Sequence, residues 1–187
     1  MKKMPTVFVG GFLPGHKVKI TNQVTPGCEW VLTGEGVATR KMDGTCTMVH
    51  GGKLFKRYDA KNGKPIPENA TPCQSEADSV TGHFPCWMPV SETDPADKWF
   101  VAAFQAAGSM EDGTYELCGP HFHRNPEKLE REIFFRHGDI VLNDVPRDFE
   151  GLRAYLKNHD LEGIVFHRGN GEMCKIKKSD FGFPWGQ

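Results

Sequence analysis

Short strand-like runs separated by glycine and proline turns limit the fold of this sequence more than any other feature. Two of them, Thr45–His50 and Lys53–Tyr58, flank Gly51-Gly52. A glycine pair suits a two-residue hairpin turn because glycine accepts positive φ at both positions. Four earlier runs are also bounded by turn residues: Thr6–Val9, Lys17–Ile20, Trp30–Leu32 and Val37–Lys41. This pattern predicts antiparallel strands through the first third of the chain.

The segment 59–85 is polar and rich in proline, asparagine and glycine. Its composition and length predict a long surface excursion. Further strands are expected after it, at Thr114–Leu117, Ile133–Leu142, Glu162–His167 and Met173–Lys177. The last two are expected to form a hairpin around Gly169-Asn170-Gly171.

Two segments carry helix signals. Asp94 and Pro95 are typical of an N-cap and a first helical position, and Gly108 is a stop signal. Between them Trp99 and Phe104 belong to an apolar stripe that we expect in the core. The second helix is expected over residues 148–158, with its apolar residues on one face. The fold class is therefore α+β: mostly antiparallel sheets with flanking helices.

The 187 residues correspond to one domain, expected to span residues 1–187. The formal net charge of −1 provides no global positive field, so a polyanion would have to bind a local patch. No apolar run is long enough to cross a bilayer or to serve as a leader, so we expect no membrane association. The six cysteines include no C-x-x-C pair, which predicts reduced thiols in a cytoplasmic protein. We also expect a monomer.

The tetrapeptide Lys41-Met42-Asp43-Gly44 ends a predicted strand, where a lysine can project into a cleft. A lysine that acts as a covalent nucleophile must lose its proton, and nearby cations or a metal favour that loss. The alternative is a surface lysine beside a turn. The tetrapeptide alone does not decide between the two.

Charged residues on three later strands could complete a site with Lys41. Glu116 lies among apolar neighbours, and alternation places it on the face opposite Tyr115 and Leu117. Glu162 begins an apolar strand, and Lys175 and Lys177 share one face of the next. Two neighbouring ammonium groups repel each other unless an anion lies between them, which is typical of a phosphate clamp. Solvated strand residues are the alternative for each.

These segments together resemble motifs I, Ia, III, IV and V of the covalent nucleotidyltransferase superfamily, which comprises DNA ligases, RNA ligases and mRNA capping enzymes. They occur in the order of that family: Lys41-x-Asp43-Gly44, Arg57, Tyr115-Glu116-Leu117-x-Gly119, Glu162-Gly163-Ile164-Val165 and Lys175-x-Lys177. The resemblance spans residues 41–178 and implies the ligase-type adenylation fold.

Length favours one branch of that superfamily. Its DNA ligases and capping enzymes carry an OB-fold after motif V, whereas only residues 179–187 follow it here, so no OB-fold is expected. The segments 97–99 and 135–139 are similar to a vertebrate-type single-domain 5′-3′ RNA ligase. A minimal ATP-dependent DNA ligase and a non-catalytic nucleotide- or nucleic-acid-binding module of the same fold are the alternatives.

The resemblance implies that Lys41 attacks the α-phosphorus of ATP and becomes a lysyl-AMP. The AMP would pass to an RNA 5′-phosphate and be displaced by a 3′-hydroxyl, so the implied partner is RNA with these two ends. Glu116 would bind the ribose hydroxyls, and Lys175 and Lys177 the α-phosphate. Glu162 would lie at the metal ion, Mg²⁺ or Mn²⁺.

Three further assignments follow from the same resemblance. The motif Ia cation that contacts phosphate or ribose is Arg57, with Lys56 as a substitute. The aromatic ring on adenine is Phe134 or Phe135, only one of which can face the cleft, and we favour Phe134. Arg40 stands beside Lys41 where some relatives carry a carboxylate that reads the adenine amine, so we count it among the nucleotide contacts with its role open.

Two other patterns are weaker. Cys118-x-x-His121-x-His123 has metal-ligand residue types without a fourth ligand at zinc-finger spacing, so structural or RNA-contacting histidines are favoured. A basic stretch beside the long loop is either a soluble surface or an RNA groove: Lys53, Lys56, Arg57, Lys61 and Lys64.

Overall fold

The computed structural model describes residues 2–12, 18–61, 65–78 and 82–186. The expected domain over residues 1–187 contains two compact units. Unit 1 comprises Met1–Lys3 and Asp43–His137, and unit 2 comprises Met4–Met42 and Gly138–Gln187. The chain therefore passes from unit 2 into unit 1 directly after Lys41-Met42 and returns after His137. Lys17, the first residue of one predicted strand, and Lys64 of the predicted basic stretch lie outside the described residues.

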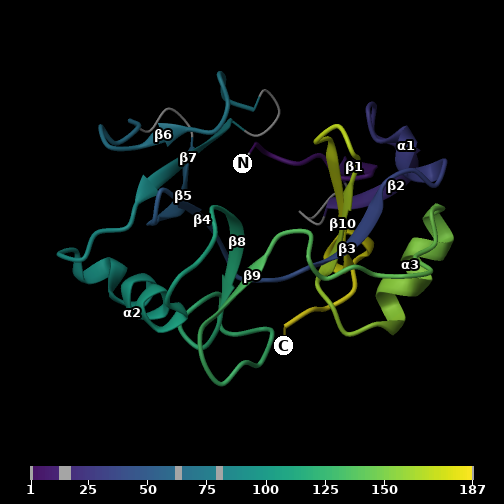
Figure 1. The fold of residues 1–187 in the computed structure, drawn as a ribbon. Helices are drawn as coiled ribbons and strands as arrows, with labels where there is room; N and C mark the ends of the chain where they lie inside the picture. Colours follow the sequence, from purple (N-terminus) through teal and green to yellow (C-terminus); the bar gives the residue numbers. More distant parts are fainter. Residues whose placement is uncertain (1, 13–17, 62–64, 79–81, 187) are drawn as a thin grey trace. The chain divides into compact units, whose positions relative to one another are not determined.

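Unit 1 is a six-stranded antiparallel sheet with one helix against it (Figure 1). Its strands, in spatial order, are β6 (Thr71–Pro72), β7 (His83–Pro89), β5 (Lys53–Lys61), β4 (Thr45–His50), β8 (Gly113–Cys118) and β9 (Ile133–Arg136). The helix α2 (Lys98–Ala107) directly follows the short 3-10 turn η1 (Pro95–Asp97). Phe100 and Phe104 of α2 pack against Val49, Leu54 and Tyr115 of the sheet.

The local signals in unit 1 explain where its elements turn and end. Gly51 and Gly52 both have positive φ, 57° and 73°, and join β4 to β5 as predicted. The Asp94 carboxylate accepts a hydrogen bond from the Ala96 N–H at 2.9 Å, which caps the helical segment. Gly108, with φ 70°, ends α2.

Unit 2 holds a three-stranded antiparallel sheet in the order β11 (Met173–Lys177), β10 (Gly163–His167), β3 (Val37–Lys41). Residues 5–7 run along the outer edge of β11, where the Val7 N–H donates to the Lys175 carbonyl at 2.9 Å. The other elements of unit 2 are β1 (Phe8–Phe12), β2 (Val18–Val24), α1 (Glu29–Leu32), α3 (Phe149–Asn158) and the 3-10 turn η2 (Lys178–Phe181).

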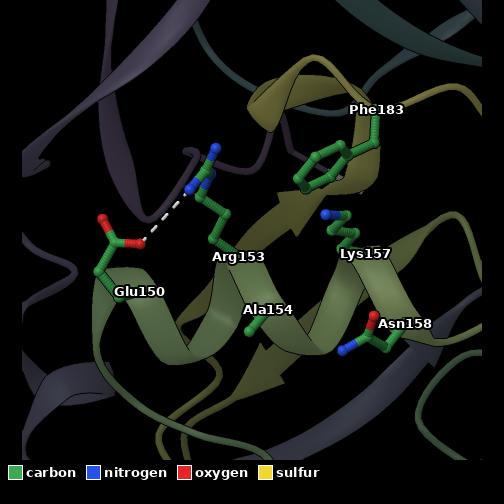
Figure 2. Close-up of a pocket in the computed structure, with 6 residues that line it drawn as sticks. All are labelled: Glu150, Arg153, Ala154, Lys157, Asn158 and Phe183. Atoms are coloured by element: carbon green, nitrogen blue, oxygen red, sulfur yellow. Dashed lines mark ion pairs between the residues drawn. The ribbon is translucent and has the colours of Figure 1, made fainter.

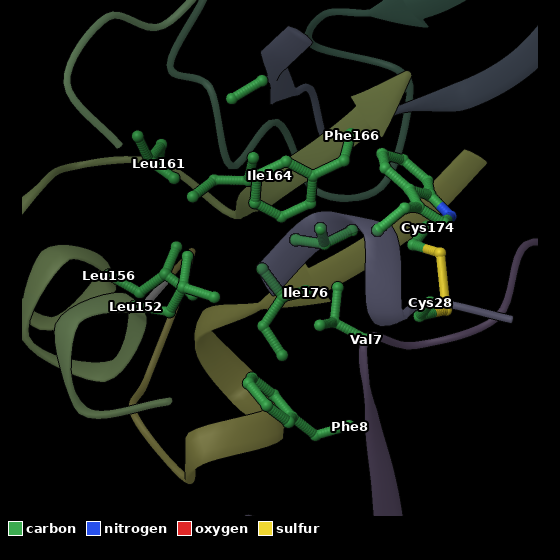
Figure 3. Packing of buried hydrophobic residues seen from close by; sticks show 13 residues of the cluster. Val7, Phe8, Cys28, Leu152, Leu156, Leu161, Ile164, Phe166, Cys174 and Ile176 are labelled. Carbon is green, nitrogen blue, oxygen red and sulfur yellow. A yellow bond between two sulfur atoms is a disulfide. The ribbon is translucent and has the colours of Figure 1, made fainter. Parts of the chain in front are cut away.

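The core of unit 2 lies between α3 and one face of this sheet (Figure 3). Leu152 and Leu156 of α3 are fully buried, as are Ile164 of β10 and Ile176 of β11. The Asp148 carboxylate accepts a hydrogen bond from the Gly151 N–H at 2.9 Å and caps α3 where the sequence predicted. The opposite face of the sheet is therefore the one that can carry polar chemistry.

Three element predictions need correction. Trp30–Leu32 is part of the helix α1, because a short buried apolar run looks the same in a helix and in a strand. The strand predicted over Ile133–Leu142 ends at Arg136. The surface excursion is shorter than expected, since β5 continues to Lys61, which pairs with His83 at the start of β7.

The prediction that all six cysteines are reduced is wrong for two of them. Cys28 and Cys174 form a disulfide across the core of unit 2 (Figure 3). They are 146 positions apart in the sequence, so spacing gave no indication that the fold brings them together. The other four are not disulfide-bonded: Cys46, Cys73, Cys86 and Cys118.

The α+β class with mostly antiparallel sheets is confirmed. Across the described part of the chain, every helix is too short or too polar to pass through a lipid bilayer.

Candidate active site

The polar face of the sheet in unit 2 carries Lys41 at the end of β3. Its Nζ lies 2.5 Å from Oε2 of Glu162, the residue directly before β10, and both side chains are largely shielded from solvent. The register explains the pairing because Lys41 stands opposite Gly163 on the neighbouring strand. Two residues 121 positions apart in sequence thus form one ion pair.

Lys175 and Lys177 share this face. Lys177 is opposite Gly163, and Lys175 is opposite Val165, so both alternate to the side that carries Lys41. Burial lowers the pKa of Lys175, and the positive charges of Lys41 and Lys177 lower it further. The three ammonium groups are therefore close enough to affect one another.

Asp180, in η2, is an acidic neighbour of the lysines that sequence reasoning missed. Its Oδ2 accepts a hydrogen bond from the Lys177 N–H at 2.8 Å. Burial raises the pKa of Asp180, while the Lys177 N–H and the nearby lysines act in the opposite direction. Its position three residues after Lys177 is that of a capping-box acid, but Lys177 stands where the sequence signature has Ser or Thr, so there was no clear sequence signal for it.

The strand register argues against a nucleotide contact by the Arg40 side chain. Arg40 is opposite Ile164, which faces the core, whereas Lys41 points to the other face. Thr39 shares the face of Lys41 instead. The Thr39 hydroxyl donates to the Val165 carbonyl at 3.2 Å, and its Oγ1 lies 3.0 Å from Nε2 of His167.

The glycine of two predicted motifs is required by a close backbone approach. A Cβ on Gly163 would lie 2.4 Å from the Ile176 carbonyl oxygen. A Cβ on Gly44 would lie 2.3 Å from the Leu117 carbonyl oxygen. Any other residue would push the neighbouring strand away. These glycines therefore keep Glu162 and Asp43, which directly precede them, close to the paired strands.

In unit 1, Glu116 lies on the sheet face away from α2. Its Oε1 accepts a hydrogen bond from the Gly44 N–H at 3.2 Å, and its Oε2 lies 3.0 Å from Nε2 of His137. Tyr115 and Leu117 point to the opposite, α2-covered face, as alternation predicted. Glu116 is only 13% exposed, so it is not a solvated strand residue.

The two candidate phenylalanines divide between the two faces. Phe134 is opposite Leu117 and packs edge-on to Tyr115 and Phe104 beneath α2. Phe135 is opposite Glu116 and therefore shares its face. The preference for Phe134 conflicts with this arrangement, and Phe135 is the ring available beside Glu116.

Two cations of the basic stretch, Lys56 and Arg57, form ion pairs with carboxylates. Lys56 alternates to the α2 side, where its Nζ pairs with the buried carboxylate of Asp97, so it cannot substitute for Arg57. Arg57 lies on the face of Glu116, and its Nε is 3.2 Å from Oδ1 of Asp59. The positive charge of Arg57 reaches the Cys46 thiol on the same face.

Cys46 and His137 are two further residues at Glu116 that sequence reasoning did not single out. Cys46 is directly opposite Glu116 on β4. Burial, together with the negative charge of Glu116, raises the pKa of the Cys46 thiol to about 12, so this thiol is neutral near pH 7. His137 follows β9, and its Nδ1 lies 3.0 Å from Oγ1 of Thr114.

The C-x-x-H-x-H pattern does not assemble into one cluster. His121 stacks on Trp99 at a ring-centroid distance of 3.3 Å and pairs with Glu132. His123 pairs with Asp43, and Cys118 is buried and is not part of a disulfide. The two histidines thus have structural partners, and Trp99, expected in the core, is 38% exposed under His121.

A shallow pocket of about 290 Å³ lies on α3 (Figure 2). Its lining residues are Glu150, Arg153, Ala154, Lys157, Asn158 and Phe183. Arg153 pairs with Glu150 within one helical turn and lies over the Phe183 ring. None of the predicted site residues lines this pocket.

The chain is similar to three curated proteins named RNA ligase 1. The protein of Rattus norvegicus is 25% identical over 167 residues. This alignment covers 70% of this chain and 47% of the rat protein. Identity is 23% over 163 residues for Danio rerio and 22% over 164 residues for Mus musculus, with 69–70% of this chain and 46% of each relative covered. The chain thus spans about half the length of these relatives. No protein-family model matches it.

Proposed function

We propose that this chain is an ATP-dependent RNA ligase that joins 5′-phosphate and 3′-hydroxyl ends through a lysyl-AMP. The observation that supports the proposal most directly is the ion pair of Lys41 with Glu162 on a sheet face shared with Lys175 and Lys177. The distant similarity to proteins named RNA ligase 1 supports RNA as the substrate.

The chemistry needs one nucleophile from the protein, and the RNA ends supply the other two. The Lys41 ammonium group first loses one proton to solvent, and the resulting amine attacks the α-phosphorus of ATP. A P–N bond forms, the bond to pyrophosphate breaks, and a second proton is released from the nitrogen to solvent. The RNA 5′-phosphate then takes the AMP from Lys41. Finally the 3′-hydroxyl attacks that activated phosphate and releases AMP. The hydrogen bond from Lys41 to Glu162 holds the amine in place for the first step.

Lys175 and Lys177 serve the first step in two ways. Their positive charge stabilises the negative charge that develops on the α-phosphate oxygens. It also attracts the negatively charged triphosphate of ATP toward the Lys41 amine. The Asp180 carboxylate keeps Lys177 in position by accepting a hydrogen bond from the Lys177 backbone N–H.

The donor set at Lys41 fits a hard divalent cation. Glu162 offers carboxylate oxygens in a partly shielded position, and Mg²⁺ or Mn²⁺ is commonly held by one or two carboxylates together with phosphate oxygens. When bound, the cation would neutralise phosphate charge.

The residues of unit 1 have nucleotide-binding roles in this proposal. Glu116 accepts hydrogen bonds from the ribose hydroxyls, and Arg57 contacts phosphate or ribose. Phe135, rather than Phe134, stacks on the adenine, because it shares the face of Glu116.

Incubation with ATP labelled at the α-phosphate tests the nucleophile. We expect covalent labelling of the wild type with Mg²⁺, none for Lys41→Ala, and unchanged labelling for the control Lys157→Ala, an exposed residue of α3. Equal labelling of Lys41→Ala would contradict the proposal. Binding of ATP without pyrophosphate release would identify a non-catalytic module.

Sealing assays test the substrate. Nicked DNA and RNA with a 5′-phosphate and a 3′-hydroxyl are compared with the same enzyme preparation. We expect the RNA to be sealed faster. Preferential sealing of nicked DNA would favour a minimal DNA ligase instead.

A further inference from the structure

Three side chains of metal-ligand type meet on the sheet face of unit 1 away from α2. The ligand atoms of Cys46, Glu116 and His137 all lie within 4.8 Å of one another. Two of these residues are directly opposed in the ladder of β4 and β8, so the sheet itself sets their distance. Such a cluster combines a thiol, a carboxylate and an imidazole.

Other groups already orient two of the three ligands. One carboxylate oxygen of Glu116, Oε1, accepts the Gly44 N–H, which leaves Oε2 directed at His137. The imidazole contacts Thr114 through Nδ1, which leaves Nε2 directed at Glu116. Metal-binding histidines characteristically use one ring nitrogen for the metal and the other for a hydrogen bond that fixes the ring, as the contact with Thr114 does here.

The distances suit a small tetrahedral ion. Nε2 of His137 and Oε2 of Glu116 are 3.0 Å apart. Two ligands bound at about 2.0–2.1 Å in tetrahedral geometry lie roughly 3.3 Å apart, so an ion between them requires only a small adjustment. The Cys46 sulfur lies within 4.8 Å of a ligand atom of each of these two residues, and its strand position is directly opposite Glu116.

We propose that Cys46, Glu116 and His137 bind a Zn²⁺ ion. Thiolate and imidazole ligands select a borderline-soft ion over Mg²⁺, which prefers oxygen ligands only. On binding, a Zn–S bond forms and the thiol proton is released to solvent. Three protein ligands leave a fourth position for water.

One consequence rests on the proposed function. Glu116 is the residue that would bind the ribose hydroxyls of ATP, and a zinc ion would occupy the same carboxylate. Zn²⁺ therefore inhibits lysyl-AMP formation by competing with ATP, whereas Mg²⁺ supports it. The site would make the enzyme sensitive to free zinc.

Cobalt tests the site without any reference to catalysis. Titration of metal-free protein with Co²⁺ should give a thiolate-to-cobalt charge-transfer band at one equivalent, which Zn²⁺ abolishes. Cys46→Ser and His137→Ala should lose the band, and Glu116→Gln should weaken binding at least tenfold. The matched control is Cys73→Ser, a free and half-buried cysteine of the same unit, which should bind as the wild type does.

X-ray absorption spectroscopy of the zinc-loaded wild type identifies the metal ligands directly. It needs no variant, so it still tests the site if a variant fails to fold. One sulfur and two or three nitrogen or oxygen neighbours are expected. Two sulfur neighbours, a missing cobalt band in folded wild type, or an unchanged band in folded Cys46→Ser would overturn the site.

Labelling with ATP separates the site from the proposed function. At fixed Mg²⁺, added Zn²⁺ should raise the ATP concentration needed for half-maximal labelling, and Glu116→Gln should lose this response. If the protein shows the cobalt band but is never labelled by ATP, the proposed zinc site stands and the proposed ligase function is wrong. If added Zn²⁺ leaves the labelling unchanged, the proposed competition between Zn²⁺ and ATP is wrong.

Discussion

Phe135 of β9 stands directly opposite Glu116 of β8, on the sheet face away from α2, while Phe134 points beneath that helix. Adjacent positions in one strand thus have different surroundings. One ring lies beside a carboxylate and the other belongs to the hydrophobic packing of unit 1.

The two phenylalanines should therefore respond differently to truncation. Phe135→Ala should weaken ATP binding roughly 5- to 150-fold, because a base–aromatic stack is worth about 1–3 kcal/mol. Phe134→Ala should instead reduce the free energy of unfolding by about 3 kcal/mol, at the lower end for core phenylalanines. Nucleotide titration and urea unfolding measure the two effects. The reverse pattern would restore Phe134 as the stacking residue.

Lys175→Met should separate stability from activity. The folded state lowers the pKa of Lys175 from its ordinary value of 10.5, so its ammonium form costs folding free energy at pH 7. That cost is present below the folded-state pKa and disappears as pH rises toward 10.5. We expect the variant to be at least as stable as the wild type at pH 7, with single-turnover labelling reduced about 10²–10³-fold.

Thermal unfolding between pH 6 and about 10 checks the sign of this effect. The stability of the wild type relative to Lys175→Met should improve as pH rises. Lys157→Met, an exposed control, should show neither change. A variant that unfolds more easily at pH 7 would mean that Lys175 stabilises the fold.

The ion pair of Lys56 with Asp97 should be a structural determinant of unit 1. Asp97 is 1% exposed and also accepts the Ser91 N–H at 2.9 Å. Asp97→Ala should cost about 3–5 kcal/mol, because it leaves a partly buried ammonium without its carboxylate. In that background Lys56→Met should cost little more.

A double-mutant cycle in urea measures this coupling. The exposed neighbour Glu92→Ala serves as the control and should change stability by less than about 0.5 kcal/mol. Additive effects of the two substitutions would show that the pair does not act as a unit.

The Cys28–Cys174 disulfide predicts the thiol count. Alkylation of the unfolded, unreduced protein should modify four cysteines, and reduction should expose all six. Replacing both cysteines with serine should lower stability by about 2–5 kcal/mol, because the cross-link restricts the unfolded chain. Cys73→Ser is the control. Six alkylated cysteines without reductant would contradict the bond.

Features set by neighbouring residues could be predicted from the sequence. The Gly51-Gly52 turn, the Asp94 and Asp148 caps and the stop at Gly108 depend on local backbone conformation and on hydrogen bonds within a few residues. The predictions that were wrong concern segments whose structure depends on packing against distant residues. Trp30 lies in a helix because burial, not propensity, stabilises its segment.

The same division applies to the candidate site. The sequence by itself determined that Lys175 and Lys177 share a face and that Glu116 points away from Tyr115, because side chains alternate along any strand. Only the tertiary structure decided which residues meet across strands: Glu162 with Lys41, Phe135 rather than Phe134 beside Glu116, and Cys46 with His137. Strand register and packing join residues far apart in sequence, and alternation within one strand carries no information about its neighbour.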